Sequence, residues 1–505
     1  MSAEAIKIGH LIREIRKDRG LTQTVFAEKL GTSQSAVNRI ENGKQNLSME
    51  MLARISDVLG RQIVSVSSAK TMSFRVEGGR ELKGEIETKV SKNATVGLLC
   101  AALLNRNTTI LERVPRIEEV NRLIEVLQSI DVSVKWLKNN DLEIKPPKEL
   151  NLAKMDKTAA KKTRSIIMFL GPLMHLFKEF QIPYAGGCSL GTRTVKPHLM
   201  ALEQFGVDIV ATRGHYQVSV KKKAPGKIVM YESGDTPTEN VLMAAALTPH
   251  PVTIKMASAN YAIQDMCYFL QTLGVKIEGI GTTTLHVHGV KAINKRVHYA
   301  PSEDPIETMA FLSIAATTNS SITIKRCPID FLELELLKME KMGFRYKVLK
   351  EYKARNGSTN LVDIKTLKHD GLVALEEKIY ARPYPGLNID NLPFFVPIAA
   401  AAKGRTLIHD WVFENRAIYY TELSKLGVKV ELVDAHRVFI DGPTKFRPVD
   451  VTTPPALRPA VIILIGMLAA EGTSVLRNVY SINRGYEDLA NRLNTLGAKI
   501  EMIAE

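Results

Sequence analysis

The residues most able to do chemistry lie in one glycine-punctuated stretch, residues 186–198, which reads GGCSLGTRTVKPH. Glycines let a backbone turn sharply and approach a ligand closely. Arg193 offers a planar guanidinium to a phosphate or carboxylate, and a cation close to Cys188 favours the reactive thiolate. Cys188 is therefore a candidate proton donor or nucleophile. The alternative is a tight turn that holds a small apolar cysteine.

Composition limits the classes of protein to which this stretch can belong. A chain of 505 residues is long enough for about three domains, and its net charge of +15 indicates anionic partners. Cys100, Cys188, Cys267 and Cys327 are far apart and match no metal spacing, so we expect reduced thiols, a cytoplasmic protein, and no metal or organic cofactor. No signal-peptide pattern or apolar run of membrane-spanning length is present, so no membrane contact is expected.

Residues 1–66 carry the pattern of a small all-α module. Gly20, Gly31 and Gly43 mark the ends of three short helices, and Thr22, Ser33 and Ser48 are placed to cap the second, third and fourth. Apolar residues recur at helical spacing in the first helix, at Ile8, Leu11, Ile12 and Ile15, and the second carries Val25, Phe26 and Leu30. In the fourth, Met51, Leu52, Ile55 and Leu59 are expected to face inward.

The segment 21–43, LTQTVFAEKLGTSQSAVNRIENG, resembles the Cro/lambda-repressor type of helix-turn-helix domain. The resemblance implies that one set of polar side chains faces the major groove of DNA or its phosphates, and that the protein binds DNA as a dimer. That set is Gln23, Gln34, Ser35, Asn38 and Arg39. A dimerisation or docking module is the alternative, and residues 67–71 are expected to be a linker.

The rest of the chain repeats one α+β unit six times. A helix ends in a short turn and runs into an alternating strand roughly every 70 residues. The six junctions lie at residues 128–134, 203–209, 271–277, 340–346, 424–430 and 494–500, and five of them contain a glycine suited to a helix end. A unit of this size is too large for a solenoid, so globular lobes of several units are expected.

This repeat, together with the cysteine loop, resembles the enolpyruvyl transferases, and within them the branch that acts on UDP-N-acetylglucosamine. The resemblance implies an α+β fold of the inside-out α/β barrel type, with two lobes of three units each around a cleft. The expected boundaries are residues 72–90 plus 302–505 for lobe 1 and residues 91–301 for lobe 2, which carries the Cys188 loop. The chain would cross between lobes near residues 90–92 and 299–303.

The family's reaction moves the enolpyruvyl group of phosphoenolpyruvate to the 3-hydroxyl of UDP-N-acetylglucosamine and releases phosphate, the first committed step of peptidoglycan synthesis. By resemblance, Cys188 is the general acid and the target of the epoxide fosfomycin, Asp390 accepts the hydroxyl proton, and Lys92 binds phosphoenolpyruvate. The other implied contacts to phosphoenolpyruvate are Asn93, Arg193, Arg416, Arg458 and Arg484. Those to the UDP-sugar are Asn93, Arg164, Arg193, Thr194, Val195, Lys196, Pro197, Asp390 and Val412.

The chain departs from the family pattern at the acceptor end. Lys196 and Met168 replace an aspartate and a tryptophan, and Ala456 stands where an aspartate is expected. Asn260 and Ala262 replace an acidic pair, and residues 234–237 read GDTP where the family usually has SVGA. Two alternatives therefore stay open. One is an enolpyruvyl transferase with another acceptor, and the other is a transcriptional regulator whose transferase-like body senses a cell-wall precursor.

Overall fold

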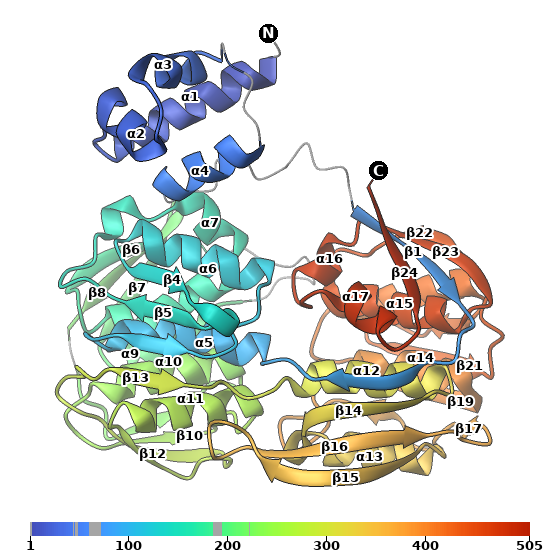
Figure 1. Cartoon of the computed structure of the whole chain (residues 1–505). Helices are drawn as coiled ribbons and strands as arrows, with labels where there is room; N and C mark the ends of the chain where they lie inside the picture. Colours follow the sequence, from blue (N-terminus) through green and yellow to red (C-terminus); the bar gives the residue numbers. More distant parts are fainter. Residues whose placement is uncertain are drawn as a thin grey trace. The chain divides into compact units, whose positions relative to one another are not determined.

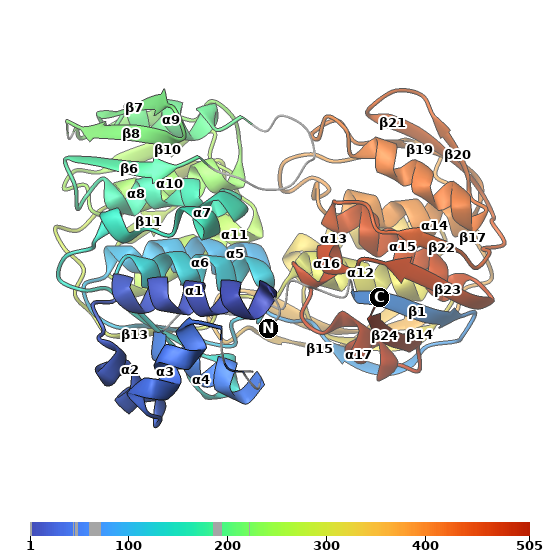
Figure 2. The same cartoon turned by 90° about the horizontal axis from the view of Figure 1, so that it is seen from above.

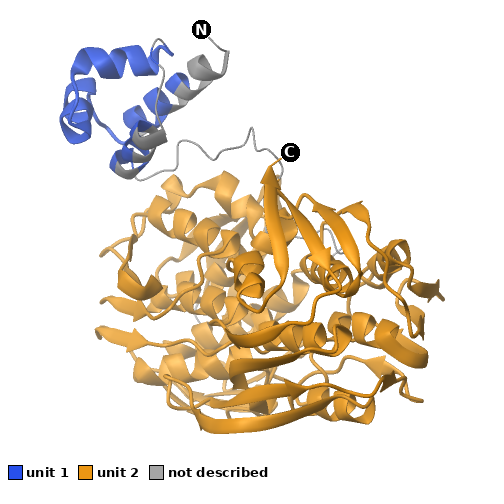
Figure 3. Ribbon diagram, turned by 45° about the vertical axis from the view of Figure 1, so that its right-hand side comes forward, with its two compact units in different colours: residues 1–70, 505 blue, residues 71–504 orange. Residues whose placement is uncertain are grey.

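The computed structural model describes residues 3–43, 45, 49–59, 72–184, 194–221 and 223–504. It divides into two compact units, residues 1–70 and residues 71–504 (Figure 3). Residues 67–71, which we expect to be a linker, lie outside the described residues. Among the described residues, no helix is both long enough and apolar enough to span a membrane.

The first unit is a bundle of short helices. They are α1 (Ala3–Asp18), α2 (Gln23–Leu30), α3 (Gln34–Glu41) and α4 (Met49–Leu59). The hydroxyl of Thr22 accepts a hydrogen bond from the amide of Val25, and that of Ser33 accepts one from the amide of Ala36, which confirms both predicted caps. Ser48, the third predicted cap, lies outside the described residues.

The core of this unit is built from the apolar residues of the predicted helices. Ile12, Ile15, Phe26, Leu30, Ile55 and Leu59 are buried, and Met51 is partly buried against them. The side chains of Ile8, Leu11 and Leu52 lie outside the described part of the chain. Val25 is 39% exposed. Phe26, Ala27 and Leu30 already fill the face of α2 that packs on the core, and Val25 lies beside that face.

The second unit contains six β-sheets within its described residues. Three are built from strands of residues 72–90 and 302–504, and we call them and their helices lobe 1. Their strand orders are β22-β23-β1-β24, β15-β16-β14-β2 and β17-β19-β21-β20, with β18 beside β19. The bounds are β1 (Met72–Gly78), β2 (Lys83–Glu87), β14 (Ser321–Pro328), β15 (Arg345–Lys353), β16 (Asn360–Leu367), β17 (Leu372–Val373), β18 (Ile379–Tyr380), β19 (Ala402–His409), β20 (Lys429–Leu432), β21 (Arg437–Gly442), β22 (Asp450–Thr452), β23 (Gly472–Arg477) and β24 (Lys499–Ala504).

The other three sheets come from residues 91–301, and with their helices they are called lobe 2. Their strand orders are β13-β3-β5-β4, β6-β8-β7 and β11-β12-β10-β9. The bounds are β3 (Thr109–Leu111), β4 (Ser133–Trp136), β5 (Leu142–Lys145), β6 (Glu179–Pro183), β7 (Val207–Thr212), β8 (His215–Val220), β9 (Lys227–Val229), β10 (Val252–Lys255), β11 (Lys276–Glu278), β12 (Thr284–His288) and β13 (Val297–Tyr299). The two lobes lie side by side in both Figure 1 and Figure 2.

Each lobe is built around inner helices that are apolar on all sides, as expected for helices enclosed by sheets. In lobe 1 these are α12 (Pro305–Thr317), α14 (Phe395–Ala401) and α15 (Leu457–Ala469), which pack on one another. In lobe 2 they are α5 (Lys92–Ala101), η4 (Arg164–Phe169), α8 (Leu170–Leu173) and α10 (Asp235–Ala246). All thirteen residues of α12 are buried. Burial of these helices supplies much of the apolar core of each lobe.

A second set of helices leads into the strands. These are α6 (Glu118–Ser129), α9 (Lys196–Glu203), α11 (Tyr261–Thr272), α13 (Glu333–Lys341), η7 (Ala417–Leu426) and α17 (Leu489–Asn494). The residue that ends each predicted junction turn has a positive φ: Asp131, Gly206, Gly274, Gly343, Gly427 and Gly497. The left-handed conformation closes the helix and reverses the chain, which confirms the six-unit repeat. Short elements complete the unit: η1 (Ala102–Leu104), η2 (Lys138–Asn140), η3 (Leu152–Lys154), α7 (Lys157–Lys162), η5 (Ile329–Phe331), η6 (Leu392–Phe394) and α16 (Tyr480–Asn483).

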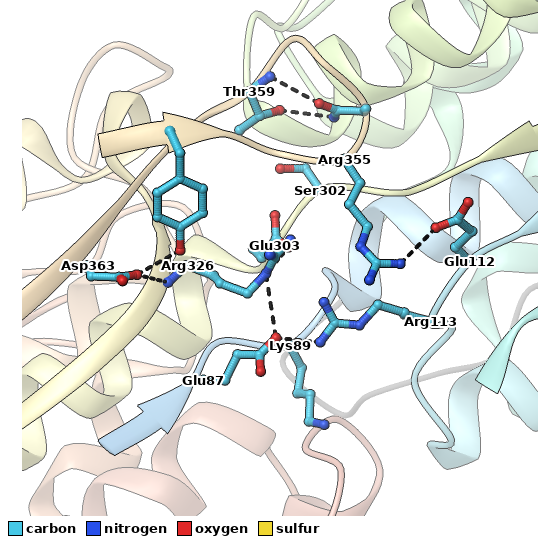
Figure 4. Close-up of polar contacts among 12 residues, drawn as sticks. Glu87, Lys89, Glu112, Arg113, Ser302, Glu303, Arg326, Arg355, Thr359 and Asp363 are labelled. Atoms are coloured by element: carbon cyan, nitrogen blue, oxygen red, sulfur yellow. Dashed lines mark hydrogen bonds and ion pairs between the residues drawn. The ribbon is translucent and has the colours of Figure 1, made fainter. Parts of the chain in front are cut away.

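The chain crosses between the lobes twice, and the two crossings pair with each other. Val90 forms an antiparallel bridge with Glu303, and the amide of Ser91 donates to the carbonyl of Ser302 at 2.8 Å. Ion pairs surround these crossings (Figure 4). Arg326 of lobe 1 donates to the buried carboxylate of Glu303 and lies 3.5 Å from the carboxylate of Glu87. Arg113 of lobe 2 also donates to Glu87, so one carboxylate is held from both lobes.

Candidate active site

The inner helices, and α11 beside them, begin at polar side chains. These positions are Lys92 and Asn93 in the first turn of α5, Asp235 at the start of α10, Asn260 before α11, Asp304 before α12, Asp390 before η6 and α14, and Arg458 in the first turn of α15. The first turn of a helix has free N–H groups and a partial positive charge. Several such ends directed at one place favour an anionic ligand, and the contacts below link them to one another.

Two of the predicted phosphoenolpyruvate cations share one carboxylate. The ammonium of Lys92 in lobe 2 lies 2.8 Å from Glu119, and the guanidinium of Arg484 in lobe 1 lies 4.0 Å from the same oxygen. Burial raises the pKa of Glu119, but the charges of Lys92 and Arg484 outweigh burial and hold this pKa below its usual range. The structure therefore brings together a cation from each lobe.

The other two described cations lie on either side of Asp390. Arg416 Nη1 is 3.4 Å from one carboxylate oxygen of Asp390, and Arg458 Nη2 is 3.8 Å from the other. Arg458 also donates to the hydroxyl of Tyr486 at 2.9 Å. Two guanidiniums thus place positive charge beside the carboxylate that is predicted to accept the hydroxyl proton.

Arg416 is fixed more rigidly than an ordinary ligand-binding arginine. It is 1% exposed, and its Nε and Nη2 donate to the two oxygens of the buried Asp410 at 2.6 and 2.9 Å. Nη2 also donates to the carbonyl of Ile389, and the guanidinium stacks on the ring of Phe413. These contacts occupy Nε and Nη2, so Nη1 is the atom presented toward Asp390.

A chain of polar contacts connects the Lys92 end to the Asp390 end. The amide of Asn93 donates to the hydroxyl of Tyr261 at 2.8 Å, and Asn260 precedes this tyrosine at the helix start. Asn260 in turn accepts a hydrogen bond from Asn388, two residues before Asp390. Burial raises the pKa of Tyr261 well above its ordinary value, so the phenol stays protonated.

The residues predicted to hold the nucleotide are described in part. Arg164 donates to the backbone carbonyl of Thr194 at 2.8 Å, which ties η4 to the segment before α9. Thr194 and Lys196 are exposed, Val195 is half-buried and Pro197 is buried. Val412 is 43% exposed, beside the equally open Trp411. Cys188 and Arg193 lie outside the described residues, and their roles stay predictions.

A buried histidine lies behind this segment. His198 is 2% exposed; its Nδ1 accepts from the amide of Asn240 at 2.9 Å, and its Nε2 lies 3.2 Å from the hydroxyl of Thr236. Because the amide nitrogen can only donate, the ring proton is on Nε2. Burial, and then the charge of Arg164, lowers the pKa of His198 to about 3, so the ring is neutral.

The sequence prediction named the cations of the site but missed their partners. Glu119, Asp410, Tyr486 and Tyr261 were not singled out. An acid in the first turn of a helix, like Glu119, is ordinarily explained by the helix dipole. Residues 413–416, which read FENR and end in Arg416, lie close after Asp410 in the sequence, and a buried arginine requires an acceptor nearby.

In the first unit, α3 presents the side chains predicted to contact DNA. Gln34, Ser35, Asn38 and Arg39 are exposed on one side, while Ala36, Val37 and Ile40 are buried on the other. Gln23 bonds both Gln34 and the buried Glu41, and Glu41 pairs with Arg16. The polar face is thus fixed to the core of the unit. The DNA contacts themselves stay a prediction.

Comparison with known families assigns both units. Residues 76–493 match the family model described as EPSP synthase (3-phosphoshikimate 1-carboxyvinyltransferase). Residues 12–65 match a helix-turn-helix model.

Several full-length relatives bear one name, UDP-N-acetylglucosamine 1-carboxyvinyltransferase. The protein of this name from Bradyrhizobium diazoefficiens is 32% identical over 436 residues, which cover 86% of this chain and 99% of the relative. That from Helicobacter pylori (strain ATCC 700392 / 26695) is 31% identical over 436 residues, with the same coverage. That from Bacteroides thetaiotaomicron is 30% identical and covers 85% of this chain and 100% of the relative.

Solved structures share the fold of the second unit. The enolpyruvyl transferase NikO from Streptomyces tendae superposes with a TM-score of 0.74 at 22% identity, over 86% of this chain and 99% of that one. An EPSP synthase from Acinetobacter baumannii gives a TM-score of 0.67 at 17% identity, over 86% of this chain and 100% of that one. The predicted two-lobed fold is confirmed.

Proposed function

Because the chain belongs to the EPSP synthase (3-phosphoshikimate 1-carboxyvinyltransferase) family over residues 76–493, we propose that it is an enolpyruvyl transferase acting on UDP-N-acetylglucosamine. In this reaction the enolpyruvyl group of phosphoenolpyruvate moves to the 3-hydroxyl of the sugar, and phosphate leaves. The choice of acceptor rests on one observation: this chain is similar in sequence to relatives named for that substrate along 99% of their length.

Cations from both lobes support the phosphoenolpyruvate half of the proposal. Lys92 and Arg484 now neutralise Glu119, and the phosphate and carboxylate groups of the substrate would engage the same two cations. Helix starts around them add backbone N–H groups. Binding energy for an anion is thereby available only when the two lobes are together.

The proposed chemistry begins at the acceptor hydroxyl. Its oxygen forms a bond to C2 of phosphoenolpyruvate while Asp390 takes the hydroxyl proton and C3 gains a proton from Cys188. In the second half, C3 returns a proton to the Cys188 thiolate, the C2–C3 double bond is restored, and the bond from C2 to the phosphate oxygen breaks. Phosphate leaves with that electron pair and takes the proton held by Asp390, so atoms and charge balance. Arg416 and Arg458 lie beside the carboxylate of Asp390, which is proposed to take the hydroxyl proton.

Phosphate release from phosphoenolpyruvate, measured with and without UDP-N-acetylglucosamine, tests the proposal. We expect acceptor-dependent release that Asp390→Asn and Lys92→Ala each lower at least about a hundredfold. Lys135→Ala, which removes an exposed lysine of β4, is the matched control and keeps wild-type turnover. If phosphate is released only with a different hydroxyl acceptor, the proposed acceptor is refuted. If none of the acceptors tested supports phosphate release, the proposed enzyme activity is refuted.

For the first unit we propose binding to duplex DNA through the exposed face of α3, by a homodimer. Fluorescence anisotropy with a duplex tests this, and Arg39→Ala is expected to lower both the affinity and its dependence on salt. DNA binding that responds to UDP-N-acetylglucosamine, in a protein without turnover, would instead support a precursor sensor.

The proposal also covers the cellular compartment of the protein and the boundaries of the two lobes. Cys100, Cys267 and Cys327 are buried free thiols, as expected in the reducing cytoplasm. The lobes are proposed to move about the paired crossings at residues 90–92 and 299–303, with the Cys188 loop carried by lobe 2. Inactivation by fosfomycin, lost in Cys188→Ala, is the expected signature of that loop.

A further inference from the structure

Four polar residues form a continuous hydrogen-bonded chain from lobe 2 to lobe 1. The carboxylate of Asp235 accepts from the hydroxyl of Ser258 at 2.5 Å and from the side-chain amide of Asn260 at 2.9 Å. The side-chain oxygen of Asn260 accepts from the amide of Asn388 at 3.4 Å. The side-chain oxygen of Asn388 accepts from the backbone N–H of Asp390 at 2.8 Å.

The direction of every bond in this chain is fixed by its last acceptor. Asp235 accepts from both of its partners, so Asn260 turns its NH₂ group toward Asp235 and its oxygen toward Asn388. Asn388 must then turn its own NH₂ group toward Asn260 and its oxygen toward the N–H of Asp390. All donors therefore point toward Asp235, and bonds aligned in one direction strengthen one another.

The lobe 1 end of the chain is anchored on both sides of Asp390. One oxygen of the buried Glu335 accepts from the backbone N–H of Asn388 at 3.1 Å and from the side-chain amide of Asn391 at 2.7 Å. The contacts of Asp390 to Arg416 and Arg458 are longer, at 3.4 and 3.8 Å. Together with the 2.7 Å bond from Arg416 to the carbonyl of Ile389, the bonds to Glu335 hold the segment in lobe 1, and the bond from the N–H of Asp390 to Asn388 links Asp390 to the chain.

The bond between Asn260 and Asn388 joins residues of different lobes, so it exists only when the lobes are together. We propose that Asp235, Asn260 and Asn388 are positioning residues, which place the carboxylate of Asp390 toward the acceptor hydroxyl as the lobes close. The inference rests on the proposed function, because it takes Asp390 as the group that accepts the hydroxyl proton.

Two departures from the family pattern, at residues 235 and 260, can then be explained as one coupled change. Asp235 lies in the GDTP segment, and Asn260 is the position where an acid is expected. The structure places these two side chains in contact, so the carboxylate missing at 260 is supplied from position 235. The acid and its amide partner have exchanged places, and a half-buried carboxylate is kept at the acceptor end.

A double-mutant cycle across the lobes tests the relay. Asn260→Ala and Asn388→Ala should each lower kcat about fivefold, the loss of one net hydrogen bond, while KM for phosphoenolpyruvate stays unchanged. The double variant should be no slower than the worse single variant, because either change breaks the same chain. Asn494→Ala is the control: its amide exchanges two bonds with Ile500 within lobe 1, and its loss should leave kcat unchanged. Additive losses in kcat, or losses confined to KM, would overturn the proposal.

Amide hydrogen exchange at residues 388–391 is a second readout that needs no turnover. Asn260→Ala should speed exchange of the Asp390 N–H several-fold although the changed residue lies in the other lobe. An unchanged rate would overturn the relay even in a fully active enzyme. If the wild-type protein releases no phosphate and this exchange still accelerates, the proposed function fails and the cross-lobe relay stands.

Discussion

Lowering the pH below neutrality should destabilise the second unit through one side chain, His198. Its pKa is about 3 in the folded protein, because the ring is buried and then because Arg164 lies close, against 6.5 in the unfolded chain. Between these values the unfolded chain binds the extra proton. The contribution of His198 is therefore fully present above pH 6.5 and is lost progressively as the pH falls toward 3.

The size of the effect follows from that difference in pKa. Each pH unit below the unfolded value costs about 1.4 kcal/mol, so a change from about pH 7.5 to about pH 5 should remove about 2 kcal/mol. Urea unfolding measures it by tryptophan fluorescence. Both tryptophans, Trp136 and Trp411, lie in the second unit, so the signal reports that unit alone.

The comparison protein is His198→Gln, which has no titrating ring. Burial raises the pKa values of Asp265 and Asp304 to about 6, and these acids shift stability in the opposite direction over the same range. They are present in both proteins, so the difference between the two curves isolates His198. The wild-type protein should lose about 2 kcal/mol more than the variant. Parallel curves would refute the reasoning.

Two further predictions concern stability at other places in the chain. Arg326→Ala should lower the free energy of unfolding of the second unit by about 3 kcal/mol, because Glu303 would stay buried at the lobe crossing without its partner. Arg345→Ala, which removes an exposed ion pair with Asp370, is the control in the same urea assay. Equal effects of the two substitutions would contradict the prediction. Ser33→Ala should remove the cap of α3, destabilise the first unit by about 1 kcal/mol and weaken DNA binding, as measured by anisotropy. Ser33→Asp should retain the cap. A Ser33→Ala variant that binds DNA like the wild-type protein would contradict this prediction.

Local patterns in the sequence were sufficient to predict the repeat. Helix ends leave a mark on the sequence, because a left-handed residue at that position is best supplied by glycine. Five of the six predicted junctions contain such a glycine, and the sixth has Asp131 in the same conformation.

The ion pairs of the site could not be predicted from spacing. Lys92 and Glu119 are 27 residues apart, and Arg484 reaches the same acid from the far end of the chain. The first pair depends on how two helices pack within lobe 2, and the contact of Arg484 depends on how the two lobes meet; no local period records either. The same holds for Asn260 and Asn388, each of which is an unremarkable turn or cap residue in its own segment.

Mass spectrometry of the nucleotide sugar after incubation with phosphoenolpyruvate tests the central claim most directly. The account predicts UDP-N-acetylglucosamine converted to its enolpyruvyl ether, with one phosphate released for each product formed and no conversion by Lys92→Ala. Unchanged nucleotide sugar in the presence of the wild-type protein, with or without phosphate release, would contradict it.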